Sequence, residues 1–156
     1  VKVLDTGLNS LTAKRILKLK KNFKEGEDFF MTYGDGVSDL DLSRLFKHHK
    51  KNKKICTLTA VRPIARFGEL KIKGNTVYSF NEKPQLKQGW INGGFFVLNY
   101  KIFRFLDNKN QMFEREPIKK LLKKKNVNAF KHNGFWMCMD TLRDKILLEK
   151  IIQNYV

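Results

Sequence analysis

Two aspartates stand where a carboxylate could meet a ligand. Asp35 comes shortly after the apolar run 29–32 and has a glycine on each side, and Asp140 ends the apolar run 136–139. Carboxylate oxygens beside phosphates suit Mg²⁺, so the two acids together indicate a magnesium site. Taken singly, Asp35 is more readily interpreted as a turn residue and Asp140 as a helix cap.

A second group of residues could hold a phosphorylated sugar. Glu82 and Lys83 precede Pro84 at the end of a predicted hairpin, where lysine suits a phosphate and the carboxylate can accept sugar hydroxyls. The passage 90–94, Trp-Ile-Asn-Gly-Gly, places an aromatic ring, an amide and two small residues together. Both segments also fit ordinary turns and strand starts, so their residue types alone leave the role open.

Patterns for several other chemistries are absent from the sequence. There is no Ser/His/Asp or Cys/His arrangement, no Walker-type phosphate loop and no G-x-G-x-x-G. The three histidines have no second ligand at metal spacing and are predicted to be structural. Cys56 and Cys138 lie in apolar surroundings, which predicts buried, reduced thiols of a cytoplasmic protein.

Alternating strand and helix patterns must position these residues. Apolar, β-branched runs predict strands at 1–4, 29–32, 55–61, 67–73, 76–80, 93–98 and 127–131. Helical spacing predicts helices at 10–23, 42–49, 101–106, 115–124 and after Thr141, the last burying Leu142, Ile146, Ile151 and Ile152. Thr141-Leu142-Arg143-Asp144 resembles a capping box at the start of this last helix. We therefore predict a single domain, 1–156, with a Rossmann-like layered α/β fold and a mainly parallel mixed sheet, incomplete at its N-terminus.

The net charge of +17 suggests phosphate-bearing partners. Lysine runs at 18–24, 47–54 and 119–125 fall on the polar faces or ends of predicted helices, where they are ordinary solvated surface. A basic nucleic-acid-binding module is the alternative hypothesis, and substrate steering is a third. No apolar run approaches the ~20 residues that cross a bilayer, so we predict no membrane insertion. Because the lysine runs are interpreted as ordinary solvated surface, we also predict no nucleic-acid partner.

The ordered series of motifs is more specific than any one of them. Its members include Tyr33-Gly34-Asp35-Gly36-Val37, Phe80-Asn81-Glu82-Lys83-Pro84, Gly89-Trp90-Ile91-Asn92-Gly93-Gly94 and Met139-Asp140-Thr141-Leu142-Arg143-Asp144. The series resembles the sugar-1-phosphate nucleotidyltransferase family over essentially the whole chain. The Trp-Ile-Asn-Gly-Gly run and the Trp136 approach to Asp140 resemble its cytidylyl branch, the glucose-1-phosphate cytidylyltransferases.

The resemblance implies a reaction in which glucose 1-phosphate attacks the α-phosphorus of CTP, giving CDP-glucose and pyrophosphate. Asp35 and Asp140 would bind Mg²⁺, and Lys83 would join them in catalysis. The nucleotide would contact Ser10, Arg15 and Gly34. The sugar phosphate would be held by Gly68, Glu82, Lys83, Asn92 and Gly93. UTP or dTTP in place of CTP is an alternative within the same family.

Two departures from the family pattern are visible. The family's opening Gly-rich loop is not in this sequence, so we expect the true N-terminus to lie upstream and this segment alone to be nearly inactive. Thr12-Ala13-Lys14-Arg15 stands where the family has Thr-Gly-Gly-Arg, which puts base contacts there in question. A scaffolding protein that keeps the fold without the activity is a further hypothesis. The resemblance also implies a homo-oligomer when the protein is complete.

Overall fold

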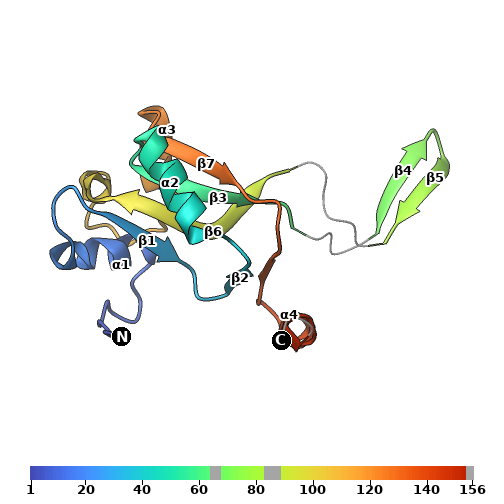
Figure 1. The fold of residues 1–156 in the computed structure, drawn as a ribbon, viewed down its shortest axis with the longest axis horizontal. Helices are drawn as coiled ribbons and strands as arrows, with labels where there is room; N and C mark the ends of the chain where they lie inside the picture. The colour runs from blue at the N-terminus through green and yellow to red at the C-terminus, as the bar shows by residue number, and fades with distance from the viewer. Residues whose placement is uncertain (64–67, 83–88, 154–156) are drawn as a thin grey trace. The chain divides into compact units, whose positions relative to one another are not determined.

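The computed structural model describes residues 1–63, 68–82 and 89–153. Its helices and strands, labelled in Figure 1, are α1 (Thr12–Lys18), the 3-10 helix η1 (Lys20–Asn22), β1 (Asp28–Thr32), β2 (Gly36–Ser38), α2 (Leu42–Asn52), β3 (Cys56–Val61), β4 (Glu69–Lys73), β5 (Thr76–Asn81), β6 (Ile91–Asn99), the 3-10 helix η2 (Tyr100–Arg104), α3 (Glu116–Lys123), β7 (Val127–Lys131), β8 (Trp136–Cys138) and α4 (Leu142–Gln153). The predicted α/β class is confirmed.

Four strands form the largest sheet, in the order β1-β6-β3-β7. The sheet is mixed as predicted, but it is mainly antiparallel and includes parallel strands, so the prediction of a mainly parallel sheet is wrong. β3 and β6 are nearly continuous runs of buried residues. Such runs are typical of parallel strands covered on both faces, but a central antiparallel strand produces the same pattern.

The chain divides by its contacts into two compact units, each described here by itself. The first comprises residues 1–31, 42–58 and 96–130. Its interior is apolar, with Leu45, Phe96, Ile102, Phe113 and Leu121 among the buried side chains. Burying each such side chain contributes about 1.5–3 kcal/mol, which explains why α2 and α3 form although their exposed sides are rich in lysine. The prediction of one domain, 1–156, stays a prediction.

Three phenylalanine rings stack on one another within the first unit. The Phe23 and Phe29 rings stack with centroids 4.0 Å apart, and Phe103 lies 6.0 Å from Phe29. Phe23 follows the α1–η1 segment, Phe29 belongs to β1 and Phe103 to η2. Phe23, at the end of the helix predicted at 10–23, therefore joins the α1–η1 segment to β1 and η2.

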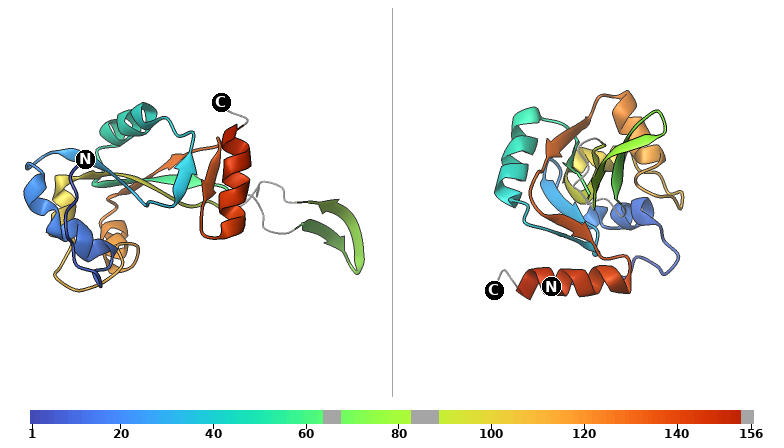
Figure 2. Two further views of the ribbon diagram at one scale, coloured as in Figure 1. Left: turned by 90° about the horizontal axis from the view of Figure 1, so that it is seen from below. Right: turned by 90° about the vertical axis from the view of Figure 1, so that its right-hand side faces the viewer.

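The second unit comprises residues 32–41, 59–95 and 131–156. It contains the two-stranded ribbon of β2 and β8, which pair antiparallel with Gly36 opposite Cys138 and Ser38 opposite Trp136. Figure 2 shows this ribbon and the helix α4 that follows it. α4 begins with the predicted capping box, in which the Thr141 N–H donates to Asp144 Oδ2 and the Asp144 N–H donates to Thr141 Oγ1.

The predicted hairpin is also part of the second unit. β4 and β5 pair antiparallel around the two-residue loop Gly74-Asn75, and Gly74 has a φ of 58°. A glycine at positive φ in the first loop position matches the right-handed twist of the strands. The hairpin prediction is confirmed.

Two predictions for the ends of the chain are wrong. Val1–Leu4 form no strand, and Val1 and Val3 are exposed. In α4 the predicted apolar face is not buried: Leu142, Ile146 and Ile152 are exposed, and Leu148 is the buried residue of the described helix. Helical spacing shows that apolar residues share a face, but not whether another element covers it. No helix within the described ranges is long and apolar enough to span a membrane.

Candidate functional site

The β2–β8 ribbon brings together the segments that carry the two aspartates. The Met139 N–H donates to the Asp35 carbonyl oxygen at 2.9 Å, which extends the ribbon by one pair beyond Gly36 and Cys138. Asp140 is the next residue along the chain. Sequence positions more than one hundred residues apart are thus joined at one end of the ribbon, as the prediction of a shared site requires.

The Asp140 carboxylate also contacts its own strand. Cys138 Sγ–H donates to Asp140 Oδ2 at 3.2 Å. Burial and this hydrogen bond raise the pKa of Cys138 to about 11, so the thiol stays protonated and acts as a donor. Cys56 is buried in the first unit, and burial raises its pKa to about 12. Both cysteines are free thiols, as predicted, but only Cys56 is buried: Cys138 is half-buried, so the prediction of burial is wrong for it.

The donor chemistry of the ribbon end suits a divalent cation. Mg²⁺ is usually bound by one or two carboxylates together with substrate phosphates and water, not by a cage made wholly of protein. Across residues 1–63, 68–82 and 89–153, no group of three or more His, Cys, Asp or Glu is placed to hold a metal ion. The binding of a metal ion by Asp35 and Asp140 stays a prediction.

Glycines in the predicted site differ in the space around them. A Cβ added at Gly34 would meet nothing within 4 Å, so the backbone there is open to a ligand. A Cβ at Gly93 would lie 2.8 Å from Val61 Cγ1 and 3.2 Å from the Thr59 carbonyl oxygen. The surroundings of Gly34 therefore leave room for a side chain, whereas Gly93 must be glycine because β6 packs closely on β3.

The predicted sugar-binding residues fall into two places in the second unit. The Asn92 side chain accepts a hydrogen bond from the Gly94 N–H at 3.0 Å, within the first part of β6. Gly68 and Glu82 are neighbours at the base of the hairpin, where a Cβ on Gly68 would lie 3.2 Å from Glu82 Oε2. Lys83 lies outside the described residues.

Ser10 and Arg15 belong to the first unit. The Arg15 guanidinium donates to Thr6 Oγ1 at 2.6 Å and to the Leu8 carbonyl oxygen at 3.2 Å, and the Ser10 N–H donates to the Gly7 carbonyl oxygen. Arg15 therefore holds the 6–10 segment against α1. Their contact with a nucleotide stays a prediction.

Sequence reasoning missed a side-chain cluster beside the ribbon. His132 Nε2 lies 2.9 Å from Asp39 Oδ1, 3.2 Å from Ser38 Oγ and 3.2 Å from the Phe135 carbonyl oxygen. The available signal was the position of Ser38 and Asp39 at the end of one short strand and of His132 just before another. Without the pairing of β2 with β8, nothing connected these residues.

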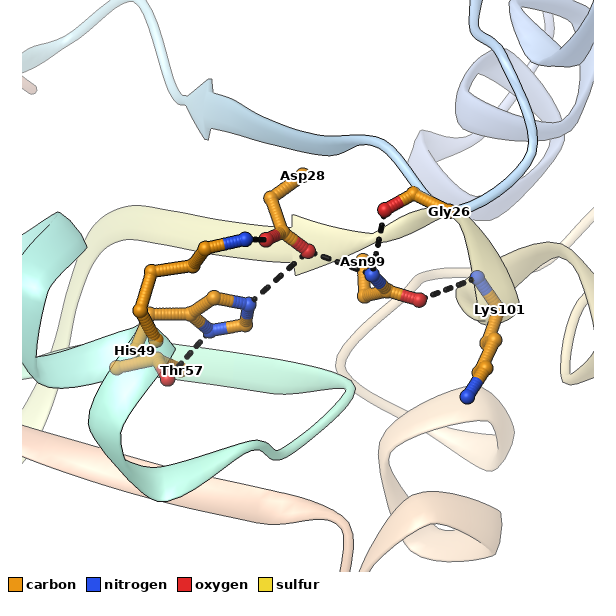
Figure 3. Close-up of polar contacts among 7 residues, drawn as sticks. Gly26, Asp28, His49, Thr57, Asn99 and Lys101 are labelled. Carbon is orange, nitrogen blue, oxygen red and sulfur yellow. Dashed lines mark hydrogen bonds and ion pairs between the residues drawn. The ribbon is translucent and has the colours of Figure 1, made fainter.

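A second polar cluster lies inside the first unit. His49 is 2% exposed; its Nδ1 lies 2.8 Å from Thr57 Oγ1 and its Nε2 lies 3.4 Å from Asp28 Oδ1 (Figure 3). Lys50 Nζ donates to Asp28 Oδ2 at 2.7 Å, and the Asn99 amide donates to Asp28 Oδ1 at 2.6 Å. The cluster ties α2 to β1, β3 and β6, which supports the predicted structural role of this histidine.

Burial sets the ionisation of the second cluster. Burial lowers the pKa of His49, although the nearby Asp28 favours its charged form. For Asp28, burial acts to raise the pKa, but hydrogen bonds from Lys50 and Asn99 and the charges of His49 and Lys50 outweigh it, so the pKa is lowered. An open pocket of about 550 Å³ adjoins this cluster and contains none of the predicted site residues.

Known proteins resemble this chain in sequence and fold. The family profile described as Nucleotidyl transferase matches residues 5–146, a span that includes every predicted site residue. A glucose-1-phosphate cytidylyltransferase of Salmonella typhimurium is 46% identical over 149 residues, which are 96% of this chain and 58% of that protein. Mannose-1-phosphate guanylyltransferase 1 of Arabidopsis thaliana is 29% identical over 126 residues, 78% of this chain and 35% of that protein.

The fold has solved counterparts. HddC from Yersinia pseudotuberculosis has a TM-score of 0.63 with 22% sequence identity, covering 90% of this chain and 62% of that one. This likeness concerns the fold alone, and the structural neighbours have a Rossmann-like fold, so this part of the fold prediction is confirmed. The chain spans 58% of the length of the first curated relatives that it matches. From the profile match over most of its length, the chain belongs to the nucleotidyl transferase family.

Proposed function

We propose that the protein containing this chain joins the cytidylyl group of CTP to glucose 1-phosphate, forming CDP-glucose and pyrophosphate. The observation that carries this proposal is the 46% identity over 149 residues to a protein named glucose-1-phosphate cytidylyltransferase. Relatives named for guanylyl transfer to mannose 1-phosphate are more distant, at 27–29% identity.

The residues of this chain would act by positioning and charge. A phosphate oxygen of glucose 1-phosphate forms a bond to the α-phosphorus of CTP while the bond to the β-phosphate oxygen breaks and pyrophosphate leaves. Glu82 and Lys83 would hold the sugar phosphate in line for this attack. Because a Cβ at Gly34 would meet nothing within 4 Å, the nucleotide could approach the backbone at this residue. No protein nucleophile is required.

Asp35 and Asp140 would hold the divalent cation that enzymes of this family usually use. Mg²⁺ is the ion we propose, because its preference for one or two carboxylates matches the ribbon end. When bound, it would supply neutralisation of charge on the triphosphate. The backbone hydrogen bond between Met139 and Asp35 supports the assignment, because it places the two acidic segments side by side.

Three further features stay proposals. A homo-oligomer and a single nucleotidyltransferase domain follow from the family resemblance. A cytoplasmic location follows from the two free thiols and from the class of substrates. UTP or dTTP as the nucleotide is the alternative within the same reaction class.

The test uses the product of the complete open reading frame that encodes this chain. Pyrophosphate release is measured with glucose 1-phosphate, Mg²⁺ and each of CTP, UTP, dTTP, GTP and ATP in turn. We expect kcat/KM for CTP to exceed that for UTP or dTTP by at least about 100-fold, because a site that hydrogen-bonds the correct base leaves buried polar groups unpaired when another base binds. Preference for UTP or dTTP would reject the base assignment, and no release with any triphosphate would reject the reaction class.

A further inference from the structure

We propose that His132 and Asp39 are positioning residues, which fix the pairing of β2 with β8 and thereby hold Asp35 beside the segment that carries Asp140. The functional part of this inference rests on the proposed function, because that proposal gives the two acids their role. The structural part, that these side chains hold the ribbon in register, stands on contacts within the second unit alone.

The His132 ring is the centre of the contacts. Its Nε2 faces a carboxylate oxygen of Asp39 at 2.9 Å and the Phe135 carbonyl oxygen at 3.2 Å, and both of these can only accept. Ser38 Oγ–H donates to the same carbonyl oxygen at 2.8 Å, so Ser38 Oγ, 3.2 Å from the ring, is also an acceptor toward His132. Nε2 must therefore carry the hydrogen, and one N–H faces three acceptors.

These contacts cross the two strands of the ribbon at one end. Ser38 ends β2 and Asp39 follows it, whereas Phe135 directly precedes β8. The Asp39 N–H also donates to the Phe135 carbonyl oxygen at 3.2 Å. The histidine, serine and aspartate thus converge on the peptide at which β8 begins.

The ribbon is too short to fix its own register. It has three paired positions, from Gly36–Cys138 to Ser38–Trp136, and an isolated two-stranded ribbon is marginal in water. A slip of one residue would turn every side chain of one strand to the opposite face. The His132 contacts at one end and the Met139–Asp35 backbone hydrogen bond at the other hold the pairing between them.

Burial makes the His132 contacts effective. The His132 side chain is 12% exposed, so water replaces its hydrogen bonds poorly if they break, whereas Asp39 is 56% exposed. Gly134 leaves the room that the pair needs: a Cβ there would lie 2.7 Å from His132 Cε1 and would also collide with the Asp39 carboxylate. Gly134→Ala therefore disturbs the pair without removing either member.

The test compares His132→Ala, His132→Gln and Gly134→Ala with the wild type in the complete gene product. Glutamine keeps an N–H donor at about the reach of Nε2 and is the matched control. The first readout is hydrogen exchange of the Met139 amide, which bonds to Asp35. We expect about tenfold faster exchange in His132→Ala and Gly134→Ala, and a change within about threefold in His132→Gln.

The second readout is the affinity for Mn²⁺ alone, measured by calorimetry, with kcat and KM beside it. We expect His132→Ala to weaken Mn²⁺ binding about tenfold and to lower kcat while leaving KM for glucose 1-phosphate nearly unchanged, as for residues that orient metal ligands. His132→Gln is expected to retain nearly the wild-type Mn²⁺ affinity and kcat.

The outcomes separate this inference from the proposed function. Unchanged Met139 exchange in both His132→Ala and Gly134→Ala overturns the structural part. Faster exchange with unchanged Mn²⁺ affinity and kcat overturns the positioning role. A wild-type protein that transfers no nucleotidyl group rejects the proposed function, while the exchange measurement still decides whether His132 holds the ribbon.

Discussion

At the scale of the residue, main-chain pairing joins the segments that carry the two aspartates. Asp35 directly precedes β2 and Asp140 lies two residues after β8, and the Met139–Asp35 hydrogen bond extends the β2–β8 ladder between them. Nearby, the Cys138 thiol donates to Asp140 Oδ2, and a Cβ at Gly34, next to Asp35, would meet nothing within 4 Å.

Replacing either acid by its amide tests this arrangement. Asp35→Asn and Asp140→Asn preserve size but remove the negative charge, so we expect kcat/KM to fall by at least about 100-fold and Mn²⁺ affinity to fall with it. Asp107→Asn, at a solvent-exposed carboxylate paired with Lys120, is the control and is expected to leave both unchanged. Loss of activity with intact Mn²⁺ binding would show that the acids do not hold the metal.

At the scale of the element, the close packing of β6 on β3 explains one of the site glycines. Gly93→Ala would press a methyl group against Val61 Cγ1 and the Thr59 carbonyl oxygen, and we expect it to lower the free energy of unfolding by about 1–3 kcal/mol. Gly34→Ala, where a Cβ meets nothing within 4 Å, is the matched control and is expected to change stability by less than about 0.5 kcal/mol.

The same pair of variants separates structure from binding. Because Gly34 is proposed to let the nucleotide approach, Gly34→Ala is expected to raise KM for CTP although it leaves stability unchanged. Chemical denaturation and steady-state kinetics provide the two measurements. Equal destabilisation by both variants would show that the space around Gly34 is filled in the folded protein.

The buried His49 gives the first unit a pH-dependent stability. The pKa of His49 is lowered on folding, so the unfolded chain binds the proton more tightly. The contribution of His49 to the free energy of unfolding is therefore fully present above about pH 6.5, the ordinary pKa of histidine. It is lost as the pH falls from there toward the pKa of His49 in the folded protein. The lowered pKa of Asp28 contributes stability above the ordinary carboxyl pKa near 4, and this contribution is lost as the pH falls below that value.

His49→Asn is expected to flatten this dependence. Removing one titrating group reduces the slope of unfolding free energy against pH, below about pH 6.5, by up to about 1.4 kcal/mol per pH unit. Urea denaturation at a series of pH values measures the slope. Thr57→Val removes the hydrogen bond to His49 but no titrating group, so it should lower stability and keep the slope. An unchanged slope in His49→Asn would contradict the assignment.

At the scale of the whole molecule, the charge of +17 favours contact with polyanions of any kind. A dedicated surface for single-stranded nucleic acid would interleave lysines with exposed aromatic rings. Phe23, Phe29 and Phe103 stack on one another, and Phe96 and Phe113 are buried against each other, so these five rings are not free to stack on bases. Phe30, Tyr78 and Phe80 are exposed, so the nucleic-acid hypothesis is decided by experiment.

Salt dependence distinguishes non-specific attraction from a real nucleic-acid site. We expect DNA and RNA to bind weakly at low salt and to show no measurable binding at about 150 mM salt, since the attraction comes from counterion release alone. Fluorescence anisotropy with labelled oligonucleotides provides the measurement. Micromolar binding that persists at 150 mM would revive the nucleic-acid hypothesis.

Local chemistry made part of this protein predictable from sequence. The Gly74-Asn75 turn, the Thr141–Asp144 capping box and the buried strand β3 depend on neighbouring residues, and the structure confirms each. The family prediction succeeded for a related reason, because the order of short motifs along the chain is itself sequence information and is confirmed by the profile match.

Tertiary structure decided what depends on distant partners. Strand direction in the main sheet, the exposed apolar face of α4 and the absence of a strand at Val1–Leu4 each depend on which segments pack together, a property that residue periodicity does not encode. The His132–Asp39 contact is of the same kind, since it joins positions 93 residues apart through the pairing of β2 with β8. The sequence by itself determined which residues could do chemistry, and the packing of strands determined which of them meet.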